Sequence, residues 1–93
     1  KELAYLKKSV ALNPYFIDGW IDLARCEIER QNFDTAHQYL AVANYIDEND
    51  FRYYYYQGLM YKHQGNLNEA VYNFKKSLIL NPDFTPAKEE LSI

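Results

Sequence analysis

The side chains of this chain that could carry chemistry are two histidines, one cysteine and a few neighbouring carboxylates. His37 and His63 have no Cys or carboxylate at metal-ligand spacing, so we predict no zinc site. Cys26 has no second cysteine to pair with, and we interpret it as an inert, buried thiol. Asp18 and Asp22 could act as general acid and base only in a pocket that shifts their pKa values. Charged faces of exposed helices explain such carboxylates better, so we predict no catalytic residue and no cofactor.

The composition narrows the class of protein further. The chain has 93 residues, enough for one domain, and 48% of them are hydrophobic. Its net charge of −3 argues against nucleic-acid binding, which needs a basic face. No apolar run approaches the ~18 residues of a membrane span. The sequence starts inside a predicted helix, so we expect a piece of a longer protein. A single cysteine is compatible with a reducing compartment, and we predict a cytoplasmic location.

Residues 51–64 are predicted to form the first helix of a helix–turn–helix unit. Tyr54, Gly58 and Tyr61 share one helical face. Gly58 lies inside this helix, where glycine costs ~1 kcal/mol relative to alanine. We interpret it as a site against which a second backbone packs. Gly65 and Asn66 are predicted to end the helix, because both tolerate the left-handed conformation.

Residues 67–80 are predicted to form the second helix, antiparallel to the first. Ala70, Phe74 and Ser77 share its apolar face. Asn68 is placed to cap its start. Pro82 ends it, since proline disfavours helix at the preceding residue.

This unit recurs with a period of about 34 residues. Residues one period apart match in type, as Trp20 does with Tyr54 and Leu40 with Phe74. A fixed period in this range indicates a solenoid of stacked helix pairs. Two periods apart, residues 7–14 match residues 75–82.

The repeat resembles the tetratricopeptide repeat, TPR. In that family a large aromatic, a small residue and a tyrosine mark the first helix, and small and large apolar residues followed by proline mark the second. The matching positions here are Trp20, Leu23, Ala24, Tyr54, Gly58, Tyr61, Ala36, Leu40, Ala43, Ala70, Phe74, Ser77, Pro14 and Pro82. Glu27 departs from the family's tyrosine and Glu48 from its proline. The resemblance implies an all-α fold, an α-solenoid of antiparallel helix pairs with about two and a half repeats of a TPR superhelix.

We predict a single TPR domain over residues 1–93. Its parts are the second helix of a truncated repeat (1–14), two repeats (15–48 and 49–82) and a C-terminal capping helix (83–93). Six helices are expected near residues 2–12, 16–30, 33–46, 50–64, 67–80 and 84–92, with bounds good to about two to four residues. The residues expected to be mostly buried are Trp20, Leu23, Leu40, Tyr54, Tyr61 and Phe74.

The first predicted helix lacks a partner on one side. The face formed by Leu3, Leu6 and Val10 should therefore be partly uncovered, because a solenoid repeat cannot bury its apolar face alone. We expect this helix to fray or to pair with another copy of the chain. In the last predicted helix, Lys88 occupies the repeat position that Trp20 and Tyr54 hold in the earlier repeats. A lysine at this position suits a capping helix with one face in water.

In TPR arrays the first helices of the repeats line a concave groove, and the resemblance places one set of residues there. These are Asp18, Ile21, Asp22, Arg25, Arg52, Tyr55, Tyr56, Leu59, Lys62 and Glu89. The centre of this surface is aromatic and aliphatic, which is typical of an interaction surface, and its ends are acidic. Alternatively, Tyr55 and Tyr56 cover neighbouring helices with their hydroxyls in water. The Lys and Asn with which some TPR proteins clamp chaperone C-termini do not stand at the matching positions.

Two classes of function remain open. The first is a protein–protein interaction module or scaffold that binds a peptide segment of a partner in the groove. Apolar partner residues would contact Tyr55 and Tyr56, and basic ones would lie near Asp18 and Asp22. The second is self-association as a homo-oligomer, or a spacer element within a larger TPR protein. An enzyme would need its catalytic site elsewhere in the parent protein.

Overall fold

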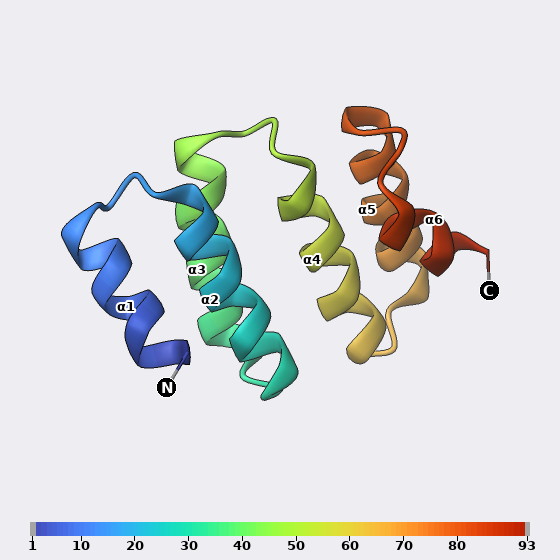
Figure 1. Cartoon of the computed structure of the whole chain (residues 1–93). Helices are drawn as coiled ribbons and strands as arrows, with labels where there is room; N and C mark the ends of the chain where they lie inside the picture. Colours follow the sequence, from blue (N-terminus) through green and yellow to red (C-terminus); the bar gives the residue numbers. More distant parts are fainter. Residues whose placement is uncertain (1, 93) are drawn as a thin grey trace. The chain divides into compact units, whose positions relative to one another are not determined.

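The computed structural model describes residues 2–92. All regular secondary structure in that range is α-helical (Figure 1). The helices are α1 (Glu2–Leu12), α2 (Ile17–Glu29), α3 (Phe33–Ile46), α4 (Phe51–His63), α5 (Leu67–Leu80) and α6 (Thr85–Leu91). Each lies within about one residue of its predicted bounds. The prediction of an all-α fold is confirmed.

The chain forms two compact units, residues 1–48 and 49–93. The first unit contains α1, α2 and α3, and α2 packs against both of the others. The second contains α4, α5 and α6, and here α5 packs against both of the others. Each unit therefore holds one complete helix pair, α2–α3 or α4–α5, and one additional helix.

Both helix pairs turn through the same hydrogen-bonded motif. The backbone N–H of Asn32 donates to the carbonyl oxygen five residues earlier (2.8 Å), and the N–H of Asn66 does the same (2.9 Å). These are Schellman motifs, which need a left-handed residue just after the helix. Gln31 (φ 63°) and Gly65 (φ 79°) fill that position. The prediction that Gly65 ends its helix is confirmed.

The core of the first unit lies where α2 crosses α1. Leu6 and Val10 are buried there together with Leu23 and Cys26, and Leu3 packs against this cluster. The prediction that the apolar face of α1 is partly uncovered is wrong for Leu6 and Val10, because α2 covers it. The first helix therefore needs no second copy to bury these side chains.

The core of the second unit is organised around Phe74, which is 3% exposed. A Cβ added at Gly58 would lie 2.6 Å from Cε1 of Phe74. The prediction that a second backbone approaches Gly58 is therefore wrong, since an aromatic ring of α5 fills that space. Ala24 and Leu40 hold the corresponding positions in the first unit, and both are fully buried.

The residues predicted to form the core are mostly buried. Leu23, Leu40 and Phe74 are buried, and Trp20, Tyr54 and Tyr61 are partly buried. Large aromatic rings with a polar atom often keep one edge near water. Trp20 is partly buried, and its indole N–H donates to the carbonyl oxygen of Pro14 at 2.8 Å.

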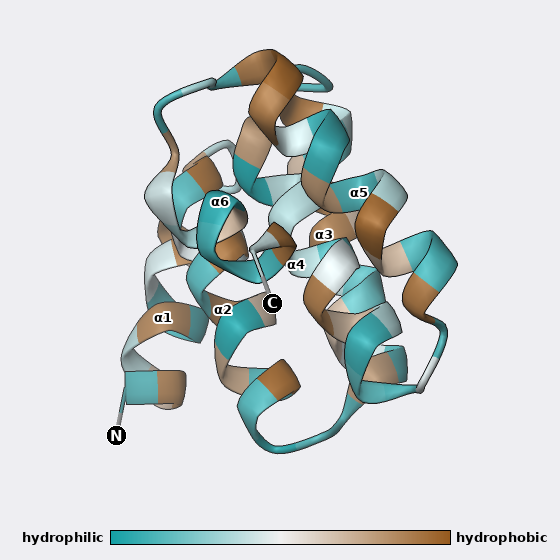
Figure 2. Cartoon of the chain, turned by 90° about the vertical axis from the view of Figure 1, so that its right-hand side faces the viewer, coloured by the Kyte–Doolittle hydropathy of each residue, from teal (hydrophilic) through white to brown (hydrophobic). Residues whose placement is uncertain are grey.

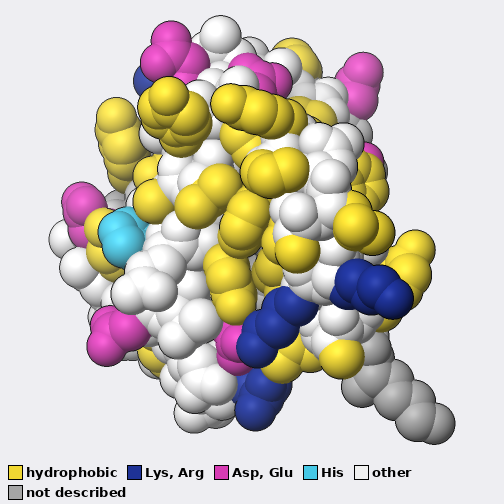
Figure 3. All heavy atoms as spheres, turned by 90° about the vertical axis from the view of Figure 1, so that its left-hand side faces the viewer, with side chains coloured by type: hydrophobic (Ala, Val, Ile, Leu, Met, Phe, Trp, Pro, Cys, Tyr) yellow, Lys and Arg dark blue, Asp and Glu magenta, His cyan; other side chains and the backbone are white. Residues whose placement is uncertain are grey.

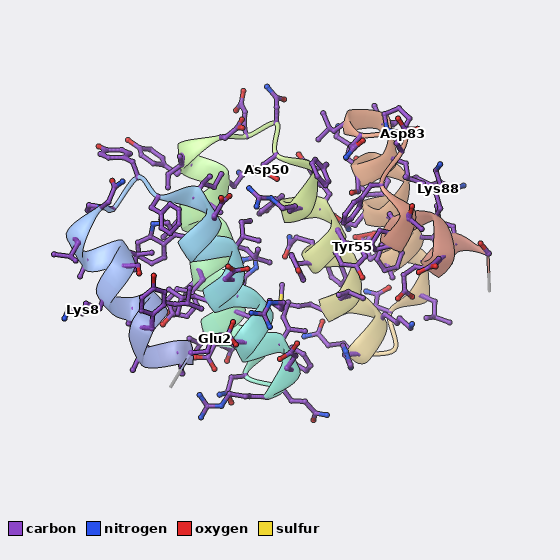
Figure 4. The ribbon with its side chains drawn as sticks, viewed as in Figure 1. Glu2, Lys8, Asp50, Tyr55, Asp83 and Lys88 are labelled. Carbon is purple, nitrogen blue, oxygen red and sulfur yellow. The ribbon has the colours of Figure 1, made fainter. Side chains whose placement is uncertain are left out.

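The starts of α5 and α6 can be compared with the predictions from the sequence. Helix α5 begins at Leu67 after Asn66, with no side-chain capping hydrogen bond, so the prediction that Asn68 caps it is wrong. Pro86 lies in the first turn of α6, where its missing N–H costs nothing. Lys88 is exposed on α6, as expected for a capping helix (Figure 4).

Candidate functional site

The candidate site in the second unit is one face of α4. Its side chains recur at helical spacing and come from Arg52, Tyr55, Tyr56, Leu59 and Lys62. All of them are partly buried except Lys62, which is exposed. This face, together with Glu89 of α6, is called the α4 surface below. Both helices belong to the second unit, so the unit itself fixes the surface.

Asp50 sets the start of α4 and holds the first residue of the α4 surface. The backbone N–H of Arg52 donates to Oδ1 of Asp50 at 2.9 Å, which makes Asp50 a side-chain N-cap. The guanidinium of Arg52 donates to both carboxylate oxygens, at 3.0 and 2.7 Å. Burial alone would raise the pKa of Asp50, but the hydrogen bonds from Arg52 outweigh it and lower this pKa. Arg52 therefore has a structural role at the helix start.

Tyr55 links α4 to the start of α6. Its ring centroid lies 5.1 Å from that of Phe84 and 5.9 Å from that of Phe74. Tyr56 packs edge-on against it at 5.1 Å. Burial, and then the nearby carboxylate of Glu90, raises the pKa of Tyr55, so its hydroxyl stays a neutral hydrogen-bond donor. The ring of Tyr55, which Figure 4 labels, thus packs against the side chains of Phe74 and Phe84.

The far end of the α4 surface carries charge. Nζ of Lys62 lies 2.6 Å from a carboxylate oxygen of Glu90, which joins the end of α4 to α6. The neighbouring Glu89 is exposed. One acidic group of α6 is therefore engaged within the unit, and the other faces water.

An apolar pocket of about 230 Å³ lies beside this ion pair. It is lined by Lys62, Leu67, Ala70, Val71, Phe74 and Glu90. No local sequence pattern indicates this pocket, because residues of α4, α5 and α6 form it together. The available signal was the pair Leu67 and Val71, two large apolar residues one turn apart that remain exposed on α5.

The remaining predicted site residues lie on α2 in the first unit. Arg25 contacts the carboxylates of Glu2 (2.5 Å), on α1, and Asp22 (3.8 Å). Asp18 is exposed in the first turn of α2. Ile21 is only 2% exposed, so its side chain offers almost no surface to a partner. The candidate site residues of α2 are therefore charged groups, partly paired with one another, and one buried apolar residue.

The residues that could carry chemistry are separated or buried. Cys26 is buried, and burial raises the pKa of its thiol above the ordinary value. Within residues 2–92, no group of three or more His, Cys, Asp or Glu side chains could hold a metal ion. None of the described helices combines the length and apolar character needed to cross a membrane.

Comparison with known families defines the class of protein. Two tetratricopeptide repeat profiles match the chain, one over residues 51–84 and one over residues 3–59. The second spans more than half of the chain, and the chain belongs to the tetratricopeptide repeat family. Repeats of this family are generally protein–protein interaction modules. No curated protein matches the chain.

Proposed function

We propose that the α4 surface binds a peptide segment of a partner protein. The observation that carries this proposal is the strip of Tyr56 and Leu59, which is flanked by the charges of Lys62 and Glu89 within one compact unit. Tyrosine supplies a large contact area and loses little side-chain entropy on binding. An apolar centre with a polar rim is the usual anatomy of an interaction surface.

Tyr55 and Arg52 support this surface. The ring of Tyr55 is held against Phe84 and Phe74, and the guanidinium of Arg52 is held by Asp50. Groups that are ordered before binding lose less entropy when the partner arrives. Tyr55 and Arg52 therefore favour affinity even where their direct contact with the peptide is small.

The charged residues of α2 form a separate candidate surface within the first unit. Asp18 is exposed and Asp22 is partly exposed, and we assign them contacts with basic residues of a partner, independently of the α4 surface. Arg25 keeps Asp22 in place through their ion pair. Ile21 is left out, because it is buried.

The test uses peptides selected from a displayed random library against the chain. The affinity of the best peptide is measured by fluorescence anisotropy for the chain and for Tyr56→Ala and Leu59→Ala. Each variant should bind at least about tenfold more weakly, as expected for hot-spot residues. Tyr72→Ala, which removes an exposed tyrosine of α5, should bind within about twofold of the parent chain. Unchanged affinity in Tyr56→Ala and Leu59→Ala would refute the proposal.

Self-association is the second candidate function, and exposed apolar residues of the first unit favour it. Tyr5, Leu12 and Tyr15 are each more than two-thirds exposed. Hydrophobic side chains are frequent on the side of the molecule shown in Figure 3. Sedimentation equilibrium tests this candidate: a dimer that dissociates in Tyr5→Asp would support it, and a monomer at all concentrations would refute it.

A further inference from the structure

The start of α2 places an aspartate directly before a glycine. Asp18 is exposed and Gly19 is buried, and both lie in the first turn of the helix. Of the aspartates and asparagines in the sequence, Asp18 alone is followed by glycine. Glycine has no side chain, so its backbone nitrogen attacks the carboxyl group of the preceding aspartate with the least steric hindrance. The first turn of α2 therefore holds the aspartyl bond of the chain that cyclises most readily.

Packing between α1 and α2 explains why glycine is needed at this position. The two helices lie side by side in the first unit (Figure 1, Figure 2). A Cβ added at Gly19 would lie 2.7 Å from Cγ1 of Val10 and 2.9 Å from Cδ2 of Phe16. Any larger residue would displace these two side chains. The close approach of the helices thus retains a chemically labile pair of residues.

We propose that Asp18 is a site of spontaneous isomerisation to isoaspartate and that its contacts with α1 and the preceding loop, made through Gly19, control the rate. The backbone nitrogen of Gly19 attacks Cγ of Asp18 and forms a C–N bond. The hydroxyl of the protonated carboxyl group leaves as water together with the amide proton. Water then opens the succinimide at either carbonyl, which yields aspartate or isoaspartate of unchanged mass. The reaction needs no oxidant, reductant or enzyme.

The folded first turn opposes this ring closure. A succinimide ring holds ψ of the aspartate far from the helical value of about −42°. The N–H of Gly19 donates to the carbonyl oxygen of Phe16 at 3.1 Å and must leave this bond before the nitrogen can attack. The reaction therefore proceeds from a locally opened turn. The packing of Val10 and Phe16 against Gly19 limits the population of that open state.

Isomerisation would alter the first unit permanently. Isoaspartate inserts one additional carbon into the main chain, which breaks the regular hydrogen-bond spacing of a helix. It also moves the carboxylate of Asp18 and so removes it from the charged surface of α2. The proposal rests on the first unit alone and holds whether or not a peptide binds the α4 surface.

The test follows isoaspartate formation in the full chain during incubation at mildly acidic pH. Mass spectrometry of tryptic peptides, with electron-transfer fragmentation, distinguishes isoaspartate from aspartate. Isoaspartate should accumulate at Asp18 before any other residue, and at least about tenfold faster in urea, where the turn is open.

Variants then locate the restraint. Val10→Ala and Phe16→Ala each remove a contact with Gly19 and should accelerate the reaction in the folded chain by at least about threefold. Phe16 is 40% exposed, so its variant keeps the test valid if Val10→Ala does not fold. Phe74→Leu changes the core of the second unit and should leave the rate within about twofold.

Three results would overturn the proposal. Isoaspartate that forms first at another residue would show that Asp18 is not the preferred site. Equal rates in the folded chain and in urea would show that the first turn of α2 imposes no restraint. Equal acceleration by Val10→Ala and Phe74→Leu would assign the reaction to global unfolding of the chain instead of local opening of α2.

Discussion

Gly58 of α4 and Phe74 of α5 share one space in the second unit. A Cβ at Gly58 would lie 2.6 Å from the ring of Phe74, so the ring can sit there only because glycine has no side chain. In the first unit, Ala24 and Leu40 occupy the same two positions of the repeat, and both are fully buried. The interface within the helix pair is therefore filled differently in the two repeats. The second repeat pairs a glycine with a large aromatic ring, and the first pairs an alanine with a leucine.

Gly58→Ala should destabilise the chain by about 1–3 kcal/mol, the usual effect of overpacking. This loss should appear even though alanine favours the helix by ~1 kcal/mol over glycine. The free energy of unfolding, measured by urea titration, checks the prediction. An increase in stability would mean that Phe74 moves away at little cost.

The double variant Gly58→Ala with Phe74→Leu copies the pair found in the first unit. The double variant should lose less unfolding free energy than the sum of the losses in the two single variants. The difference is the interaction energy, which is ~0.5–3 kcal/mol for residues in contact. A double-mutant cycle of unfolding free energies measures this energy. Strict additivity would show that the two positions do not share space.

Phe74→Ala should lower the free energy of unfolding by ~3–5 kcal/mol, the range for a large aromatic in a packed core. The reason is the 3% exposure of this ring, whose removal leaves a cavity between α4 and α5. Tyr72→Ala on the same helix is the control, since an exposed position should change stability by less than about 0.5 kcal/mol. A loss below about 1 kcal/mol in Phe74→Ala would contradict the core assignment.

Gln31→Gly should stabilise the chain by about 0.5–1 kcal/mol. Gln31 holds the left-handed position of a Schellman motif at φ 63°, which costs a residue with a Cβ ~1–2 kcal/mol, and the flexibility of glycine in the unfolded state offsets part of the gain. The reverse change, Gly65→Gln at φ 79°, should destabilise by a similar amount. Thermal and urea unfolding measure the change in unfolding free energy for Gln31→Gly and for Gly65→Gln. Stabilisation of both variants, or destabilisation of both, would contradict the prediction.

Asp50→Ala should cost about 0.5–2 kcal/mol at pH 7, the usual loss for an N-cap. Because the pKa of Asp50 is lower in the folded chain, its stabilisation is complete above the unfolded value of ~3.9 and disappears as the pH falls through the folded pKa. The difference between the parent chain and Asp50→Ala should therefore shrink as the pH is lowered below about 4. Asp83→Ala, at an exposed position, is the control and should show a smaller difference at pH 7 (Figure 4). A difference for Asp50→Ala that is independent of pH would contradict the assigned cap.

The sequence by itself determined the helices and the family. Helix bounds follow from local signals, such as Gly65 after α4 and Pro86 in α6, which act through backbone conformation and need no distant contact. The period places Trp20 and Tyr54 on corresponding helices, and it also indicates which residues face the neighbouring helix. These features repeat along the chain, so each copy reinforces the interpretation of the other.

Only the tertiary structure decided which side chains of one helical face are engaged. Tyr55 and Tyr56 are adjacent and of the same type, and the sequence does not indicate that the ring of Tyr55 packs against Phe74 of α5 and against Phe84, which precedes α6. Ile21 was predicted for the groove and is buried, because helical spacing gives the direction of a side chain but not what lies opposite it. The partners of Gly58 and the pocket beside Lys62 depend on the volumes that separate helices bring together, and no local pattern in the sequence encodes those volumes.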